Sequence, residues 1–135
     1  MKTLILAGVF TLFATTTFAQ GPPQYLQDSY PEYALKSALE ARSVLQGKDA
    51  KLDAKTRELI GLGVAAQIPC TYCIYAHTQN AQKQGATEEE IREAVAAAAT
   101  VRQWSTVLNG MAVDFEAYKE ERQKRAAAKA AEAAK

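Results

Sequence analysis

Apolar residues recur every three or four positions along most of this 135-residue chain, and no segment alternates as a half-buried strand would. Helix breakers separate the periodic segments, namely Gly47, the pair Ile68-Pro69, and Gly85. Proline lacks the amide hydrogen that a helix interior needs, and glycine readily adopts the left-handed conformation that ends a helix. The sequence therefore predicts an all-α protein, a compact bundle of about five helices.

Capping residues and stops place the first four of these helices. The expected ranges are about 32–46, 53–67 with Asp53 as N-cap, 70–84, and a fourth helix that begins at the capping box of Thr87 and Glu90. A fifth helix, after a kink that could fall at 103–105, carries an apolar stripe at alternating steps of four and three. The stripe consists of Trp104, Leu108, Met111, Phe115 and Tyr118. It predicts either core or a seam against another subunit, and core is the favoured interpretation.

Residues 1–19 have the features of an export signal. Lys2 supplies a positive start, an apolar run covers 4–13, and Thr17-Phe18-Ala19 forms a small-x-small cleavage site. The run is too short to span a bilayer, so we expect no membrane anchor and a periplasmic or secreted protein cleaved near Ala19. Such compartments favour oxidised cysteine pairs.

Composition sets the remaining boundaries. Residues 20–31 are rich in proline and are expected to be an extended lead-in, and residues 32–118 form the predicted helical domain. Residues 119–135 contain mainly Ala, Lys, Arg and Glu, so we expect a solvated helical tail rather than an interaction tail. The formal net charge of only +1 gives no electrostatic reason to expect nucleic acid or an acidic membrane as a partner.

Both cysteines and the only histidine of the chain follow the Ile68-Pro69 break closely. On a helix that opens at Cys70, Cys73 lies about 60° and His77 about 20° from Cys70 around the axis, so all three share one face. The helix N-terminus favours a reactive thiolate, and two cysteines three apart can close a disulfide within one turn. His77 is within reach to relay a proton. This pattern predicts a redox-active site at the N-terminus of the third helix.

Glu58 is expected to join this site from the second helix. If the two helices form an antiparallel hairpin, reflecting Glu58 about the break gives position 79, about 3 Å of rise from His77. A carboxylate beside the histidine would orient the ring and tune its basicity. The alternative is a plain surface carboxylate that pairs with Lys55 or Arg57.

Glu58, eleven intervening residues and the stretch 70–77 (CTYCIYAH) resemble the signature of the alkylhydroperoxidase D-like branch of the carboxymuconolactone decarboxylase family. The stretches 52–60 and 85–91 are also typical of that branch, and the resemblance covers roughly 53–111. It implies an all-helical fold that assembles as homotrimers or homohexamers. It also implies a thiol-dependent peroxidase or disulfide reductase, an antioxidant activity of the peroxiredoxin type.

The resemblance further implies a role for each site residue. Cys73 corresponds to the buried cysteine that attacks the peroxide, and Cys70 to the resolving cysteine that exchanges with the reductant. His77 and Glu58 correspond to the proton relay. Tyr72 stands where the founding enzyme has a second histidine, and a phenol is a poor substitute base near neutral pH.

Together these features predict an exported thiol oxidoreductase that reduces peroxides or small disulfides. No bound cofactor is required, because the cysteines carry the electrons, and the expected partner is an unidentified thiol reductant of the thioredoxin-like type. Two alternatives stay open: a non-enzymatic helical assembly with a structural disulfide, and a zinc site made of two thiolates and an imidazole. The tiny loop of a Cys-x-x-Cys bridge stabilises a fold poorly, which favours redox function over a structural bridge.

Overall fold

The computed structural model describes residues 21–134, and all of the regular secondary structure in that range is helical. The expected export signal at 1–19 lies outside the described residues. Six helices follow one another: α1 (Gln24–Ser29), α2 (Glu32–Leu45), α3 (Ala54–Gln67), α4 (Thr71–Lys83), α5 (Glu88–Gly110) and α6 (Phe115–Ala133). The prediction of an all-α protein is confirmed. None of the described helices is both long and apolar enough to cross a membrane.

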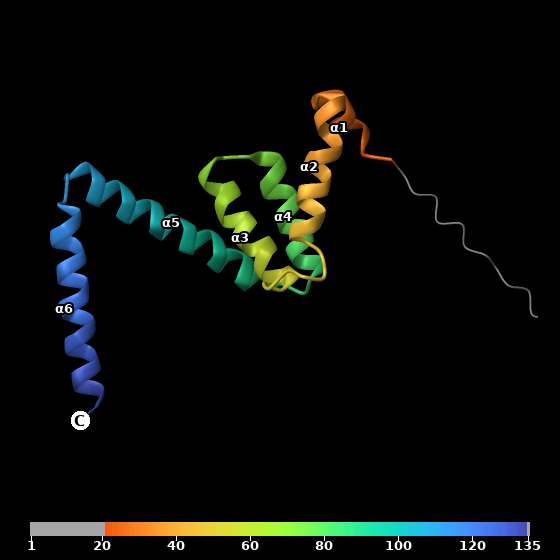
Figure 1. The fold of residues 1–135 in the computed structure, drawn as a ribbon. Helices are drawn as coiled ribbons and strands as arrows, with labels where there is room; N and C mark the ends of the chain where they lie inside the picture. The colour runs from red at the N-terminus through yellow and green to blue at the C-terminus, as the bar shows by residue number, and fades with distance from the viewer. Residues whose placement is uncertain (1–20, 135) are drawn as a thin grey trace, which may run out of the picture. The chain divides into compact units, whose positions relative to one another are not determined.

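The chain divides after Gly47 into two compact units, and each is described by itself. The first unit contains α1 and α2, which form a short helical hairpin (Figure 1). Helix α1 occupies part of the segment that the sequence predicts to be extended. The prolines do not prevent it, because Pro23 is the N-cap and the first turn of a helix needs no amide hydrogens. The Gln24 side chain also donates to Asp28 Oδ1 at 2.7 Å, one turn further along.

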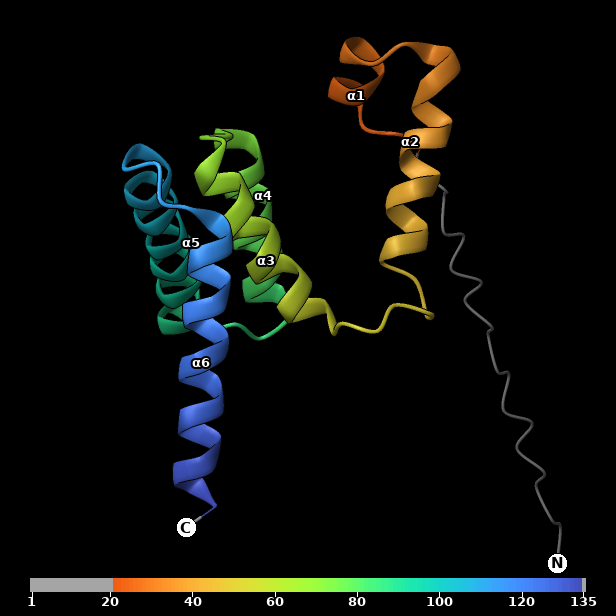
Figure 2. The same ribbon diagram turned by 60° about the vertical axis from the view of Figure 1, so that its left-hand side comes forward.

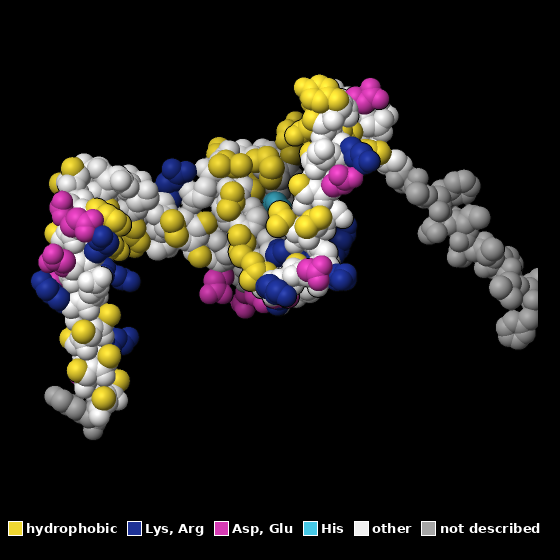
Figure 3. Space-filling model, in the orientation of Figure 1, with side chains coloured by type: hydrophobic (Ala, Val, Ile, Leu, Met, Phe, Trp, Pro, Cys, Tyr) yellow, Lys and Arg dark blue, Asp and Glu magenta, His cyan; other side chains and the backbone are white. Residues whose placement is uncertain are grey.

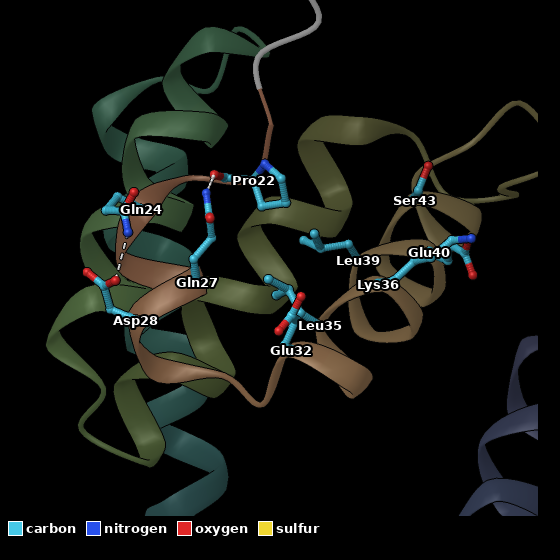
Figure 4. A pocket seen from close by; sticks show the side chains of 10 residues that line it. All are labelled: Pro22, Gln24, Gln27, Asp28, Glu32, Leu35, Lys36, Leu39, Glu40 and Ser43. Atoms are coloured by element: carbon cyan, nitrogen blue, oxygen red, sulfur yellow. Dashed lines mark hydrogen bonds and ion pairs between the residues drawn. The ribbon is translucent and has the colours of Figure 1, made fainter.

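A hollow lies between α1 and α2 in the first unit (Figure 4). Leu35 and Leu39 of α2 supply its apolar side, and Gln24, Gln27 and other polar residues line the rest. None of the four predicted site residues lines this hollow.

The second unit is built around α3, which packs against both α4 and α5 (Figures 1 and 2). The short connection at Ile68-Pro69 sends α4 back alongside α3, so the expected antiparallel hairpin is present. The buried apolar residues of this unit are Leu62, Ala65 and Ala81. The small side chains of Ala65 and Ala81 allow α3 and α4 to approach closely, and this places side chains of α3 against side chains of α4.

The predicted helix caps of this unit are confirmed. The Asp53 carboxylate accepts a hydrogen bond from the Thr56 amide at 2.9 Å. Gly85 follows the end of α4 in the left-handed conformation, with a φ of +82°. Thr87 and Glu90 form the expected capping box, with reciprocal hydrogen bonds of 2.8 and 3.1 Å. These caps fix where α3 and α5 begin and where α4 ends.

The helix that the sequence predicts after a kink at 103–105 is different in the structure. Helix α5 continues through 103–105 without a break, and the chain turns at 111–114, where Ala112 has a φ of +49° and Asp114 caps α6 by accepting from the Ala117 amide. This turn divides the expected apolar stripe, and Trp104, Met111 and Phe115 are 56%, 74% and 66% exposed. The core assignment of the stripe is therefore wrong for the described chain, because no other helix packs against α6. The alternative, a seam against another subunit, stays a prediction.

The charged C-terminal segment is helical and exposed, as predicted. Helix α6 begins at Phe115, so the expected boundary between domain and tail at 118–119 falls inside it. Ion pairs one turn apart, such as Arg125 with Glu121 at 2.6 Å, run along its surface.

Candidate active site

Cys70 and Cys73 form a disulfide at the start of α4, with their Cα atoms 5.2 Å apart. Cys70 is the N-cap of the helix, in an extended conformation, and its sulfur accepts the amide hydrogen of Cys73 at 3.2 Å. The Cys70 amide itself donates to the Ala65 carbonyl oxygen at 3.0 Å, which ties the turn back to α3. The expected closure of the pair at a helix N-terminus is therefore present.

The His77 ring pairs with Glu58 across the α3–α4 hairpin. His77 Nδ1 lies 2.7 Å from Glu58 Oε2, and the Glu58 residue is only 8% exposed. A carboxylate can only accept, so Nδ1 carries the hydrogen and Nε2 is left as the proton acceptor of the neutral ring. Because a buried carboxylate is costly without a partner, this pair accounts for an acidic residue in an apolar part of α3.

The alternative partners of Glu58 are engaged elsewhere. The Lys55 ammonium pairs with Glu90 at 2.6 Å and so joins α3 to α5. The Arg57 guanidinium donates to the Leu52 carbonyl oxygen, just before α3. The hypothesis that Glu58 pairs with His77 rather than with these two bases agrees with the structure.

A site residue that was not predicted from the sequence, Gly61, lies three residues after Glu58 on α3. A Cβ atom at this position would lie 2.5, 2.6 and 2.8 Å from Cε1, Nδ1 and Nε2 of His77. A signal for it existed in the sequence, because glycine in a helix interior costs about 1 kcal/mol relative to alanine and so needs a reason.

Tyr72 and Tyr75 of α4 are 88% and 69% exposed. Tyr72, which occupies the position of the second histidine implied by the family resemblance, is therefore mostly in solvent, whereas Glu58 is buried. In this chain the histidine that pairs with the carboxylate is His77 alone.

The zinc alternative would require both cysteines in the reduced thiolate form. Within residues 21–134, no three His, Cys, Asp or Glu side chains converge in a way that could hold a metal ion. The two sulfur atoms are bonded to each other, so neither is available as a thiolate ligand in this state.

Fold and site together define an all-helical protein whose central hairpin carries a Cys-x-x-Cys disulfide and a paired histidine and glutamate. The model of the carboxymuconolactone decarboxylase family matches residues 34–115, which is more than half of the chain. The chain therefore belongs to the carboxymuconolactone decarboxylase family.

Two relatives illustrate this membership. The chain is 38% identical over 69 residues to "Uncharacterized protein 4 in cox locus" of Paracoccus denitrificans, a match that covers 51% of this chain and 62% of that protein. Its structure is similar to the crystal structure of the alkylhydroperoxidase AhpD core from Rhodospirillum rubrum, with a TM-score of 0.59 and 29% identity over 64% of each chain. The chain thus spans less than two thirds of the length of either relative. The similarity confirms the predicted AhpD-like fold.

Proposed function

We propose that this protein is a thiol-dependent oxidoreductase that reduces peroxides or small disulfides by cycling Cys70 and Cys73 between dithiol and disulfide. The observation that carries the proposal is the disulfide at the N-terminus of α4, followed one turn later by His77 held by Glu58. A bridge across three residues constrains little of the unfolded chain, so this disulfide is better suited to redox chemistry than to stabilising the fold.

For a peroxide substrate the atoms balance as follows. The Cys73 thiolate attacks one peroxide oxygen, the O–O bond breaks, and a cysteine sulfenic acid and an alkoxide form; the alkoxide takes a proton and leaves as an alcohol. Cys70 then attacks the Cys73 sulfur, water leaves, and the disulfide closes. An external dithiol of the thioredoxin-like class reduces the disulfide by exchange and is itself oxidised to a disulfide.

The start of α4 favours the thiolate form that these steps require. The partial positive charge of a helix N-terminus and the free amide hydrogens of its first turn stabilise a negative sulfur. The amide of Cys73 already points at the Cys70 sulfur in the disulfide form. After reduction the same amide is placed to stabilise a Cys70 thiolate, the species that meets the reductant.

His77 and Glu58 supply the proton transfers of this scheme. Glu58 fixes Nδ1 as the donor side of the ring, which leaves Nε2 to take the proton of a thiol and to return it to the departing alkoxide. His77 follows Cys73 by four residues on α4, so the two side chains lie on the same helix face. The arrangement is a nucleophile, a base and a residue that orients the base.

Export, the thioredoxin-like reductant and a homotrimeric or homohexameric assembly are part of the same proposal. The surface of the second unit supports an assembly, because Ile60, Val64 and Val101 are more than half exposed and line an apolar hollow between α3 and α5. Figure 3 shows such hydrophobic side chains at the surface of these helices. Large exposed apolar patches commonly mark interfaces between proteins.

Peroxide turnover tests the proposal directly. The purified protein is supplied with dithiothreitol as the dithiol and with cumene hydroperoxide, and peroxide loss is measured above the uncatalysed reaction. Wild type is expected to turn over, and both Cys73→Ser and Cys70→Ser are expected to lose turnover. A Cys73→Ser variant that consumes peroxide as fast as wild type would contradict the assignment.

A reduction potential for the pair separates the proposal from a structural bridge. Equilibration of the protein in glutathione buffers, followed by thiol labelling, gives this potential. A catalytic pair is expected to exchange in the range of known redox proteins, at or above about −270 mV, whereas structural disulfides lie below about −300 mV.

A further inference from the structure

We infer that Gly61 is a positioning residue, which admits the His77 ring to the place where Glu58 can hold it; this inference rests on the proposed function. Gly61 lies three residues after Glu58, so the two positions share one face of α3, and this face packs against α4. Glu58 holds the ring at Nδ1, and Gly61 leaves the space that the ring occupies.

The space at Gly61 is too small for any side chain. A Cβ there would approach three atoms of the His77 ring to between 2.5 and 2.8 Å, whereas carbon contacts are favourable at about 3.5–4.0 Å. The ring would have to move by about 1 Å to relieve this overlap. One of the three atoms is Nδ1, the donor to Glu58. Movement of the ring would therefore lengthen or break the hydrogen bond of 2.7 Å between Nδ1 and Glu58.

Backbone conformation gives no other reason for glycine at this position. Among the described glycines only Gly85 has a positive φ, so Gly61 has a conformation that alanine adopts readily. Alanine would also be favoured in a helix interior, by about 1 kcal/mol. Glycine at position 61 therefore makes room for the His77 ring.

Gly63 provides a matched comparison on the same helix. A Cβ at Gly63 would lie 3.5 Å from the Ala98 Cβ and 3.7 Å from the Ala94 carbonyl oxygen, which are ordinary contacts with α5. Alanine is thus tolerated at Gly63 and excluded at Gly61. The two glycines differ in their neighbours: the His77 ring lies against Gly61, and small residues of α5 lie against Gly63.

The test compares Gly61→Ala with Gly63→Ala in the full chain. With dithiothreitol and cumene hydroperoxide, Gly61→Ala is expected to lower kcat/KM by about 10- to 100-fold, because a misplacement of about 1 Å has effects of this size. The kcat/KM of Gly63→Ala is expected to stay within about twofold of the wild-type value, a change of well under 1 kcal/mol in activation free energy. The chain has one histidine, so its Hε1 signal in a proton NMR spectrum reports on His77 alone, and it should move in Gly61→Ala and not in Gly63→Ala.

A double variant separates positioning from a general effect on the fold. In a His77→Ala background there is no ring to displace, so the addition of Gly61→Ala should cause no further loss of turnover and should raise the Tm. If Gly61→Ala alone does not fold, the double variant is still expected to fold, because the clash is with the ring.

Two results would overturn the inference. One is a Gly61→Ala variant with the wild-type histidine signal and turnover. The other is a further loss of turnover or folding when Gly61→Ala is added to His77→Ala. If wild type itself consumes no peroxide, the proposed function fails, while the histidine signal and the Tm of the double variant still decide the role of Gly61.

Discussion

Glu58 Oε2 and His77 Nδ1 lie 2.7 Å apart, across a hairpin that brings residues nineteen positions apart into contact. The carboxylate is nearly buried and the ring is about one third exposed, so one side of the ring is held while another meets solvent. A base held in this manner can exchange protons with a substrate without losing its orientation.

Substitution of Glu58 tests the relay. Glu58→Gln keeps the size of the side chain, but its amide no longer attracts the charged form of the ring, so peroxide turnover is expected to fall by about 10- to 100-fold. Glu90→Gln is the matched control, because Glu90 is also paired, with Lys55, but on the α5 side of the unit. Equal turnover for wild type and Glu58→Gln would remove Glu58 from the mechanism.

Capture of the sulfenic acid tests which sulfur meets the peroxide. After reduction and brief exposure to cumene hydroperoxide, Cys70→Ser is expected to retain a sulfenic acid at Cys73, because the resolving thiol is absent. Mass spectrometry after dimedone treatment should find one adduct on that variant. Cys73→Ser is the control and should give little adduct; the reverse pattern would exchange the roles of the two cysteines.

Acidification tests the capping network at the starts of α3 and α5. The hydrogen bond from the Thr56 hydroxyl lowers the pKa of Asp53 below 3.8, and the hydrogen bond from Lys55 lowers the pKa of Glu90 below 4.5. Because both values are lower in the folded state, these carboxylates stabilise it fully above their unfolded values, and the contribution is lost as the pH falls through the folded values.

The measurement is the Tm between pH 7 and pH 3 for wild type and for Asp53→Asn. Asparagine still caps a helix but does not titrate, so the variant should lose less Tm on acidification than wild type. Parallel curves for the two proteins would show that Asp53 does not contribute to acid sensitivity.

The sequence predicted those parts of the fold that local chemistry determines. The caps at Asp53 and Thr87, the left-handed glycine after α4 and the break at Ile68-Pro69 depend on residues close in the chain, and each is present. The pairing of Glu58 with His77 followed from the hairpin, because a short break fixes which positions of two helices meet.

The features that were not predicted depend on contacts between helices, or on competition between a helix cap and apolar periodicity. The spacing of residues in the sequence reveals neither. Gly61 has a role only because a ring of another helix lies against it. The apolar stripe from Trp104 to Tyr118 has good helical spacing, but the cap at Asp114 interrupts the helix within it. A strong cap can end a helix that apolar periodicity alone would continue.

The turn between α5 and α6 yields a prediction about stability. Ala112 has a φ of +49°, a left-handed conformation that costs an L-residue roughly 1–2 kcal/mol and costs glycine little. Glycine also loses more backbone entropy on folding, by about 0.4–1 kcal/mol, so Ala112→Gly should stabilise the protein by a net of about 0.5–1 kcal/mol. Ala99→Gly, at an exposed position inside α5, is the control and should destabilise by about 1 kcal/mol. Denaturant unfolding followed by circular dichroism measures both, and a loss of stability in Ala112→Gly as large as that in Ala99→Gly would mean that residue 112 is not held in the left-handed region in solution.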